Sequence, residues 1–252
     1  MPSPKITTGM KRDALASCPF FQPMRPEELD AMVSQSTERR VARNAVIFEK
    51  GDEGHSLLAV LAGQVRVGSI SAEGKEVTHR VFGSGEIFGE IALLDGKPRS
   101  AHAVASEDTT LLVLERRTFL PLLMRNEGML SRLLGVLCDR LRQTTLAVEE
   151  IALADLPARL ARTICRQADE HGRRTPEGAV RLSLKLSDTD LANMVASRRE
   201  TVNKQISAWR KAGLLTRDGR YLVILDGSRL RRLFESPPGS LPAAAVNFRS
   251  RS

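Results

Sequence analysis

The sequence predicts an α+β chain with a β-rich N-terminal part, a long central helix, and a C-terminal part of short helices and a hairpin. Three observations support this class. Short apolar runs separated by glycines fill residues 41–114, a heptad spacing of apolar residues covers 130–151, and two helix starts follow each other within 187–200. With 252 residues the chain is long enough for two domains with buried cores.

The N-terminal part begins with little pattern, and we expect residues 1–19 to be flexible. A short helix is expected from Arg25-Pro26-Glu27-Glu28-Leu29, because proline is well tolerated in the first helical turn. From Val41 to Leu114, short runs rich in Val, Leu and Ile end at glycines such as Gly63 and Gly83. Strands at this spacing with glycine turns indicate a sandwich or barrel.

The central part carries a seam of residues spaced alternately four and three apart: Leu130, Leu134, Leu137, Leu141, Thr144, Val148 and Ile151. This spacing predicts a helix from about Leu130 to Ala154 and favours a homodimeric coiled coil over packing within one chain. Thr144 and Thr145 place hydroxyls at the seam, and buried hydroxyls need hydrogen-bond partners. The partner is either a bound ligand or the helix carbonyl four residues back.

The C-terminal part contains two capping boxes, Ser187–Asp190 and Ser197–Glu200, each of which predicts the start of a short helix. Two short helices joined by a tight turn form a helix-turn-helix. Leu214–Ile224 reads as a hairpin with a two-residue turn at Asp218-Gly219, which adds a wing. The sequence therefore predicts a winged helix-turn-helix.

The second of these helices places its apolar residues, Val202, Ile206 and Trp209, on one face. The opposite face would carry Arg198, Arg199, Asn203 and Lys204. An arginine can bind guanine bidentately in the major groove, whereas a lysine mostly contacts phosphate. A solvated basic face without a partner is the alternative interpretation.

The charge distribution favours a polyanion as the partner of this part. Residues 1–154 contain 19 Lys or Arg and 20 Asp or Glu, whereas residues 155–252 contain 19 and 10, so the excess positive charge lies entirely in the C-terminal part. No apolar run is long enough to span a membrane, and no secretory signal is recognisable. Cys18, Cys138 and Cys165 form no metal or disulfide spacing, so we expect reduced thiols, no metal site and a cytoplasmic location.

A polar cassette interrupts the β-rich part between Phe88 and Ala101. Gly89 permits close backbone approach to a ligand, and Glu90 can accept hydrogen bonds from a ribose hydroxyl. Arg99 has the planar guanidinium that suits a phosphodiester, and Ser100 adds a hydroxyl and a backbone N–H. A charged surface turn with an Arg–Glu pair is the alternative.

These patterns together resemble the CRP/FNR superfamily of bacterial transcription regulators, the family of the cyclic AMP receptor protein. The resemblance runs from about Phe20 to about Leu233. It is carried by the I-F-x-x-G-D-x-G start at Ile47–Gly54, the cassette with FGE, ALL and PRSA at 88–101, and the R-E-T-V core at Arg199–Val202. It implies a jelly roll, a dimerisation helix and a winged helix-turn-helix.

The resemblance also implies two sets of site residues. Those for a cyclic nucleotide are Phe88, Gly89, Glu90, Ile91, Ala92, Arg99, Ser100, Ala101, Arg140, Thr144 and Thr145. Those for DNA are Ser197, Arg198, Arg199, Glu200, Thr201, Asn203 and Lys204. Lys204 stands where the family often has arginine, which leaves the base preference at that position open. An intact cassette and the threonine pair favour cyclic AMP, with cyclic GMP as the second choice, while the lone Cys18 does not suit the iron–sulfur branch.

The expected organisation has a flexible start (1–19), a jelly roll (20–125), a central helix (126–154), a winged helix-turn-helix (155–235) and a disordered tail (236–252). The expected function is an allosteric, homodimeric transcription regulator that binds a palindromic operator and contacts RNA polymerase. Constitutive DNA binding with a different effector, or with none, is the alternative. An enzyme is not expected, because Glu90 and Arg99 are accompanied by no nucleophile–base pair or metal cluster.

Overall fold

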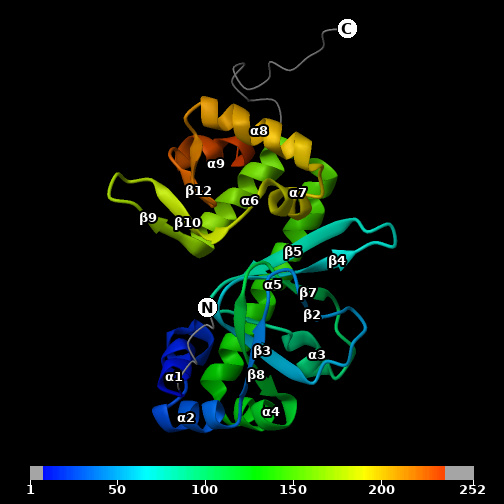
Figure 1. Ribbon diagram of the computed structural model, residues 1–252, viewed down its shortest axis with the longest axis vertical. Helices are drawn as coiled ribbons and strands as arrows, with labels where there is room; N and C mark the ends of the chain where they lie inside the picture. Colours follow the sequence, from blue (N-terminus) through cyan, green and yellow to red (C-terminus); the bar gives the residue numbers. More distant parts are fainter. Residues whose placement is uncertain (1–7, 236–252) are drawn as a thin grey trace. The chain divides into compact units, whose positions relative to one another are not determined.

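The computed structural model describes residues 8–235, which form two compact units that divide between Thr144 and Thr145 (Figure 1). The predicted disordered tail and residues 1–7 lie outside the described residues. The division falls inside the long helix α5 (Glu127–Leu153), ten residues before the expected start of the C-terminal domain. The end of α5, from Thr145 to Leu153, belongs to the second unit, where Glu150 is buried and pairs with Arg162 over 3.4 Å.

The first unit is a jelly roll of two four-stranded antiparallel sheets. One sheet has the strand order β1-β8-β3-β6 and the other β2-β7-β4-β5. The strands are β1 (Thr37–Val41), β2 (Val46–Phe48), β3 (Ser56–Ala62), β4 (Val65–Ile70), β5 (Glu76–Phe82), β6 (Ile87–Phe88), β7 (His102–Ala105) and β8 (Thr109–Glu115). Beside them lie α1 (Thr8–Ser17), η1 (Pro19–Phe21), α2 (Pro26–Ser34), α3 (Glu90–Asp95), α4 (Arg116–Arg125) and the first part of α5.

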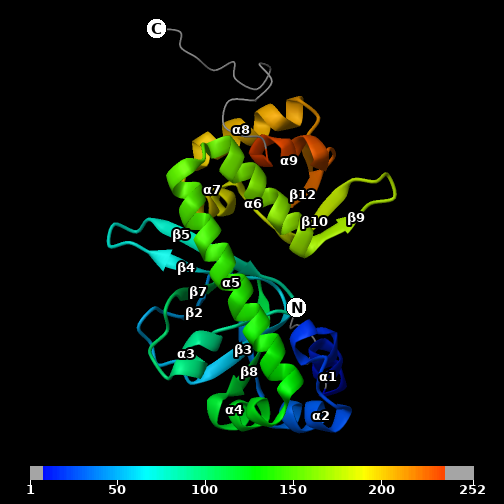
Figure 2. The ribbon, with the colours of Figure 1, turned by 180° about the vertical axis from the view of Figure 1, so that it is seen from behind.

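The strand β3 is apolar from Leu57 onward, and both of its faces are buried over residues 57–60. Side chains alternate across a strand. Leu57 and Ala59 therefore enter the core shared with the helices, whereas Leu58 and Val60 enter the core between the two sheets. Met129 and Leu133 bring α5 into the first of these cores, and Figure 2 shows α5 running past β3 and β8.

Two strands of this unit were not predicted. The strand β1 has the sequence TERRV, in which only Val41 is buried, and pairing with β8 rather than composition makes it a strand. The strand β6 has only two residues and is defined by its pairing with β3.

Part of the N-terminal segment in which the sequence shows little pattern is helical. Residues 8–17 form α1, and both Leu15 and Cys18 are buried in the core shared with the helices. The apolar periodicity of the sequence does not predict this helix, because the helix has few apolar residues. Its packing depends on core residues that are distant in the sequence. The helix α2 begins after Arg25 with Pro26 in its first turn, as predicted.

The second unit is a helix-turn-helix with a small sheet of order β11-β12-β10-β9. Its elements are α6 (Leu156–His171), β9 (Gly172–Arg174), β10 (Val180–Lys185), α7 (Asp188–Met194), α8 (Arg199–Lys211), β11 (Leu215–Asp218), β12 (Tyr221–Ile224) and α9 (Gly227–Glu235). The helix α6 begins at the N-cap Asp155, whose carboxylate accepts from the Ala158 N–H over 2.9 Å. It packs against α9 and β10.

The predicted hairpin is present but its turn lies one residue later than expected. Asp218 pairs with Tyr221, so Gly219-Arg220 form the two-residue turn, and Gly219 takes the left-handed φ of +57° that such a turn needs.

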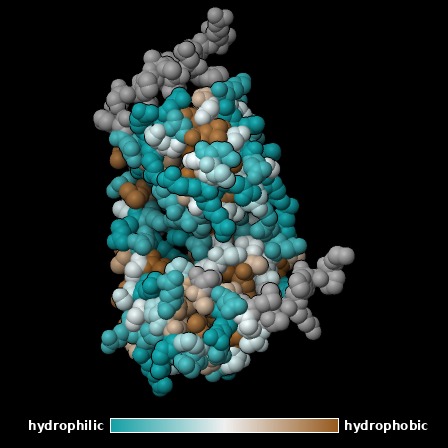
Figure 3. Space-filling model, turned by 90° about the vertical axis from the view of Figure 1, so that its left-hand side faces the viewer, coloured by the Kyte–Doolittle hydropathy of each residue, from teal (hydrophilic) through white to brown (hydrophobic). Residues whose placement is uncertain are grey.

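The face of the molecule in Figure 3 is mainly hydrophilic with a few separate hydrophobic patches, in keeping with apolar side chains buried inside each unit.

Candidate functional sites

The cassette begins at Gly89, between β6 and α3. Gly89 is the N-cap of α3 and has φ of +82°, a conformation that side chains with a Cβ rarely adopt. A Cβ at this position would also lie 2.6 Å from Nη1 of Arg99. Position 89 therefore requires glycine for two independent reasons: its backbone conformation and the space that the guanidinium takes.

Arg99 is a buried cation held by neutral oxygen atoms. Its side chain donates from Nη1 to the Gly89 carbonyl over 2.8 Å, and from Nη2 to the Ser56 carbonyl over 2.9 Å and the Ser56 hydroxyl over 3.0 Å. The guanidinium lies 4.4 Å from the centre of the Phe48 ring. Arg99 is 5% exposed, and within residues 8–235 it forms no ion pair with a carboxylate.

Burial has an electrostatic consequence for this guanidinium. The pKa of Arg99 is lowered from its usual value, mainly because burial disfavours the charged form, although the negative charges of Glu90 and Asp52 oppose the shift. A buried positive charge with only neutral partners is stabilised by an anion. The surroundings of the Arg99 guanidinium are therefore suited to a phosphate.

Glu90 is joined to the central helix by an ion pair with Arg140. Glu90 is 2% exposed, and Arg140 also donates from Nη2 to the Ile87 carbonyl over 2.8 Å. The guanidinium of Arg140 lies 5.2 Å from the centre of the Phe82 ring. The structure thus brings Glu90 and Arg140 together, although they lie far apart in the sequence.

Sequence reasoning missed several residues of this site. Arg80 of β5 lies 5.4 Å from the Phe82 ring centre, pairs with Glu86 over 3.2 Å and donates to Gln143 of α5 over 3.3 Å. Nothing in the local pattern identifies Arg80, because it occupies an ordinary strand position. Ser56, in contrast, comes two residues after the I-F-x-x-G-D-x-G motif, and this position next to the motif could have identified it as a site residue.

The remaining cassette residues differ in what they can offer a ligand. Phe88 lies in the core between the sheets, so its side chain is not available. Ala92 is buried against Gly54, where no Cβ would fit, while Ile91 is exposed. Ser100 is exposed beside the buried Arg99, and Ala101 is buried.

Thr144 lies one helical turn after Arg140 and donates its hydroxyl to the Arg140 carbonyl over 2.9 Å. This is the intrahelical bond that the sequence offered as the alternative to a ligand contact. Thr145 follows it on α5 and is exposed.

The heptad seam of α5 is only partly covered within one chain. Leu130 and Leu137 are half-buried against the jelly-roll core. The other apolar members are exposed: Leu134 by 55%, Leu141 by 69%, Val148 by 63% and Ile151 by 59%. A row of exposed large apolar side chains along one helix is typical of an interaction surface.

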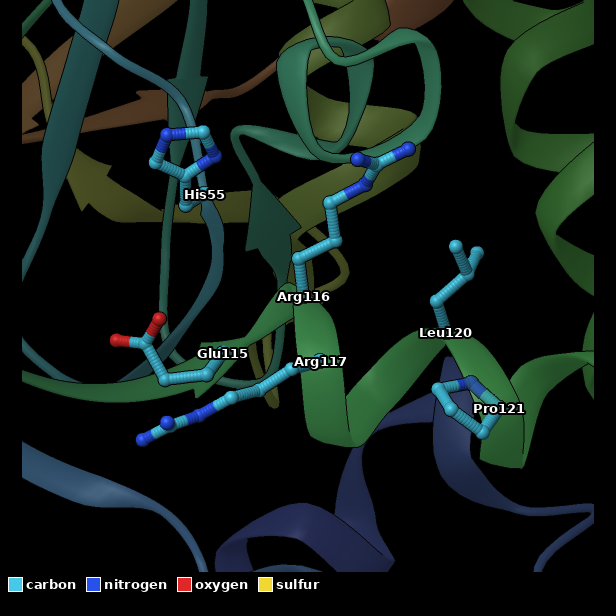
Figure 4. Close-up of a pocket in the computed structure, with 6 residues that line it drawn as sticks. All are labelled: His55, Glu115, Arg116, Arg117, Leu120 and Pro121. Atoms are coloured by element: carbon cyan, nitrogen blue, oxygen red, sulfur yellow. The ribbon is translucent and has the colours of Figure 1, made fainter.

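A separate open cleft of about 480 Å³ lies beside the junction of β8 and α4. Its lining residues are His55, Glu115, Arg116, Arg117, Leu120 and Pro121. Figure 4 shows Arg116 and Arg117 pointing in different directions, with Leu120 and Pro121 to the right of both. It includes none of the predicted ligand residues.

In the second unit, α7 and α8 form the predicted helix-turn-helix (Figure 1). Ser187 is the N-cap of α7, and the reciprocal capping box with Asp190 is present. Val202, Ile206 and Trp209 form the buried face of α8. The residues expected to contact DNA are exposed on and before this helix, apart from the half-buried Ser197: Arg198, Arg199, Glu200, Thr201, Asn203 and Lys204.

The second predicted capping box is wrong. The N-cap of α8 is Arg198, one residue after Ser197, and no side chain caps this end of the helix. Ser197 instead donates its backbone N–H to the Ala192 carbonyl over 2.9 Å. Ala196 has φ of +51°, and this left-handed residue turns the chain so that the helix starts later than the sequence suggests.

A buried arginine in a jelly roll and an exposed basic helix in a winged helix-turn-helix are features of a transcription regulator with a ligand-binding domain. Residues 38–126 match the family model described as "Cyclic nucleotide-binding domain", and residues 158–233 match "Crp-like helix-turn-helix domain". The chain belongs to the CRP/FNR family of transcription regulators, which are DNA-binding proteins and not enzymes.

Named relatives extend over most of the chain. The "CRP-like cAMP-activated global transcriptional regulator" of Mycobacterium tuberculosis is 28% identical over 221 residues, which are 87% of this chain and 98% of the relative. The "Cyclic AMP receptor protein" of Thermus thermophilus is 32% identical over 197 residues, 78% of this chain and 88% of the relative. A solved CRP-family regulator, also from Thermus thermophilus, is 29% identical with a TM-score of 0.63, covering 79% of this chain and 97% of that one.

Within residues 8–235, no helix is long and apolar enough to cross a membrane, and no cluster of His, Cys, Asp and Glu is arranged to hold a metal ion.

Proposed function

We propose that this regulator is controlled by a cyclic nucleotide, with cyclic AMP as the favoured effector and cyclic GMP as the second candidate. The observation that carries this proposal is the buried Arg99, whose guanidinium has only neutral partners and lies in one cassette with the buried carboxylate of Glu90. A cyclic phosphate would bind Arg99 and the backbone and hydroxyl of Ser100, with Ala101 beside them. The ribose would bind Gly89 and Glu90.

The charges of the cassette and the arginines beside it support a ligand with a single negative charge. Arg140 pairs with Glu90 and Arg80 pairs with Glu86, so Arg99 is the guanidinium of these three without a carboxylate partner in the described chain. A cyclic phosphodiester carries one negative charge, whereas nucleoside di- and triphosphates carry several. The names of two of these relatives include cyclic AMP, which supports adenine as the base of the ligand.

The coupling to DNA would pass through α5. A ribose hydroxyl of the ligand would donate to the Glu90 carboxylate, which already forms an ion pair with Arg140. The base of the ligand would reach the hydroxyls of Thr144 and Thr145. A ligand shifts a conformational equilibrium only by contacts that differ between the two states. Contacts on both the jelly roll and α5 would provide this difference and would reorient the DNA-binding units about residues 150–157.

The active form would be a homodimer through the exposed seam of α5. Two recognition helices about 34 Å apart would then enter successive major grooves of a palindromic operator. RNA polymerase is the partner proposed for regulation, and the bacterial cytoplasm is the proposed location, because operator DNA and polymerase are both found there.

The test is calorimetric titration with cyclic AMP and, separately, with cyclic GMP, followed by a gel-shift assay on palindromic DNA with each nucleotide. Binding heat with one nucleotide, together with tighter DNA binding in its presence, is the expected result. If both nucleotides bind but DNA affinity does not change, the pocket is not the regulatory switch.

Constitutive DNA binding, or control by a different effector, is the second candidate. It is favoured by the hydroxyl of Thr144, which already bonds to the Arg140 carbonyl and so does not need a base as its partner. No heat with either nucleotide, together with intact DNA binding, would support this candidate.

A further inference from the structure

One carboxylate, that of Asp188, joins three segments of the winged helix-turn-helix. Its Oδ2 accepts from Nδ2 of Asn203 on α8 over 2.7 Å. Its Oδ1 accepts from Nη2 of Arg217 on the wing strand β11 over 2.6 Å. The first residue of α7 therefore contacts both the recognition helix and the wing.

Arg217 is itself fixed by a second contact. Its Nη1 donates to the Leu186 carbonyl over 2.9 Å, so two nitrogens of the planar guanidinium are held in place. The side chains of Asp188 and Arg217 are 17% and 21% exposed, which makes the pair less screened by solvent than a surface ion pair. Capping of α7 is carried out by Ser187 and Asp190, so Asp188 is not needed for it.

The contact with Asp188 determines the orientation of the Asn203 amide. An amide offers N–H donors on one side and a carbonyl acceptor on the other, whereas an ionised carboxylate only accepts. Nδ2 must therefore face Asp188, and Oδ1 is left to accept from another group. Asn203 follows Arg199 by one helical turn, so the two lie next to each other on the exposed face of α8.

We propose that Asp188 is a positioning residue that presents Oδ1 of Asn203 to a base in the major groove, and that Arg217 ties the wing to this arrangement. The bases that offer an amino group there are adenine, through N6, and cytosine, through N4. Asn203 would then determine specificity for one base pair in each half-site. This inference rests on α8 being the helix that reads DNA.

The experiment begins with a palindromic duplex selected from random sequences by the wild-type protein, in parallel with and without cyclic AMP. Each position of the half-site is then changed to all four base pairs, and competition binding is measured for the wild-type protein and for Asn203→Ala, Asp188→Ala and Arg217→Gln. Asp218→Ala is the matched control, because Asp218 is an exposed carboxylate of the wing that pairs with Arg181 of β10.

We expect Asn203→Ala to reduce discrimination at one base pair by roughly tenfold, the usual effect of losing a base contact. Asp188→Ala should relax discrimination at the same base pair, and the double variant should lose no more than Asn203→Ala alone. Arg217→Gln should relax it less, and Asp218→Ala should leave it unchanged. The salt dependence of binding should stay the same in Asn203→Ala.

A purely structural role predicts a different pattern. If Asp188→Ala weakens binding equally for all base pairs, or adds its full effect to that of Asn203→Ala, the positioning role is refuted. If the wild-type protein selects no sequence under either condition, DNA reading by α8 fails, and this inference fails with it. Relaxed discrimination spread over several base pairs would also overturn it.

Discussion

Arg140 on the central helix forms an ion pair with the buried carboxylate of Glu90, and its guanidinium also donates to the Ile87 carbonyl. The residue proposed to bind the ribose is thereby connected directly to the central helix α5. A change in hydrogen bonding at Glu90 alters a contact of α5, with no intermediate side chain between them.

Removing Arg140 should destabilise the protein. Arg140→Ala leaves the buried Glu90 carboxylate without its partner, and an uncompensated buried charge costs about 3 kcal/mol in the free energy of unfolding. Urea denaturation measures this cost. Arg140→Ala combined with Glu90→Gln should recover a large part of it, and equal stabilities of the single and double variants would contradict a coupled pair.

Replacing Arg99 should remove nucleotide binding. Arg99→Gln keeps a side chain that can donate to the Gly89 and Ser56 carbonyls but lacks the positive charge. We expect the affinity for the cyclic nucleotide, measured by calorimetry, to fall about 100-fold, as for the loss of a strong charge-assisted contact. Arg117→Gln changes an exposed arginine of the same unit and serves as the control; an unchanged affinity in Arg99→Gln would disprove the phosphate assignment.

A charge in the middle of the seam should disrupt the proposed dimer. Leu141 is 69% exposed within one chain, so Leu141→Glu should not harm the fold of the monomer but would bury like charges against each other in a coiled coil. Sedimentation velocity should show a shift from dimer to monomer at micromolar concentration. Ser131→Glu, an exposed position of α5 outside the seam, should remain dimeric.

The left-handed Ala196 offers a stabilising substitution. Ala196 has φ of +51°, a conformation that costs a residue with a Cβ about 1–2 kcal/mol and glycine almost nothing. Part of this gain is offset because glycine makes the unfolded chain more flexible. We expect Ala196→Gly to raise the free energy of unfolding by about 0.5–1 kcal/mol in a denaturant titration, and a decrease would show that the turn does not strain Ala196.

The buried thiol of Cys165 should make stability fall at alkaline pH. Burial raises its pKa from an ordinary value of 9.0 to about 11. Between pH 9 and pH 11 the unfolded chain loses this proton while the folded chain keeps it. The stability that the protonated thiol contributes is therefore complete below pH 9 and is lost as the pH rises toward 11. Urea titrations at pH 8 and pH 10 should show the decrease, and Cys165→Ala should show a smaller one.

The sequence predicted features that depend on neighbouring residues. The capping box of Ser187 and Asp190, the proline in the first turn of α2, the glycine at position 89 and the seam of α5 all follow from local geometry or periodicity. Local rules failed at Ser197, where the left-handed Ala196 delays the start of α8. They also failed for α1, whose few apolar residues find their partners only in the folded core.

The type of protein can be recognised from the amino-acid order alone, because both candidate sites contain runs of adjacent residues with a characteristic chemistry. The side chains that these runs contact depend on the folded arrangement of the chain. Arg99 bonds to Ser56, 43 residues away, and Asp188 holds Asn203 and Arg217, which lie 15 and 29 residues further on. The physical reason is that hydrogen bonds and ion pairs act over a few ångströms in space, and only folding brings such distant positions within that range.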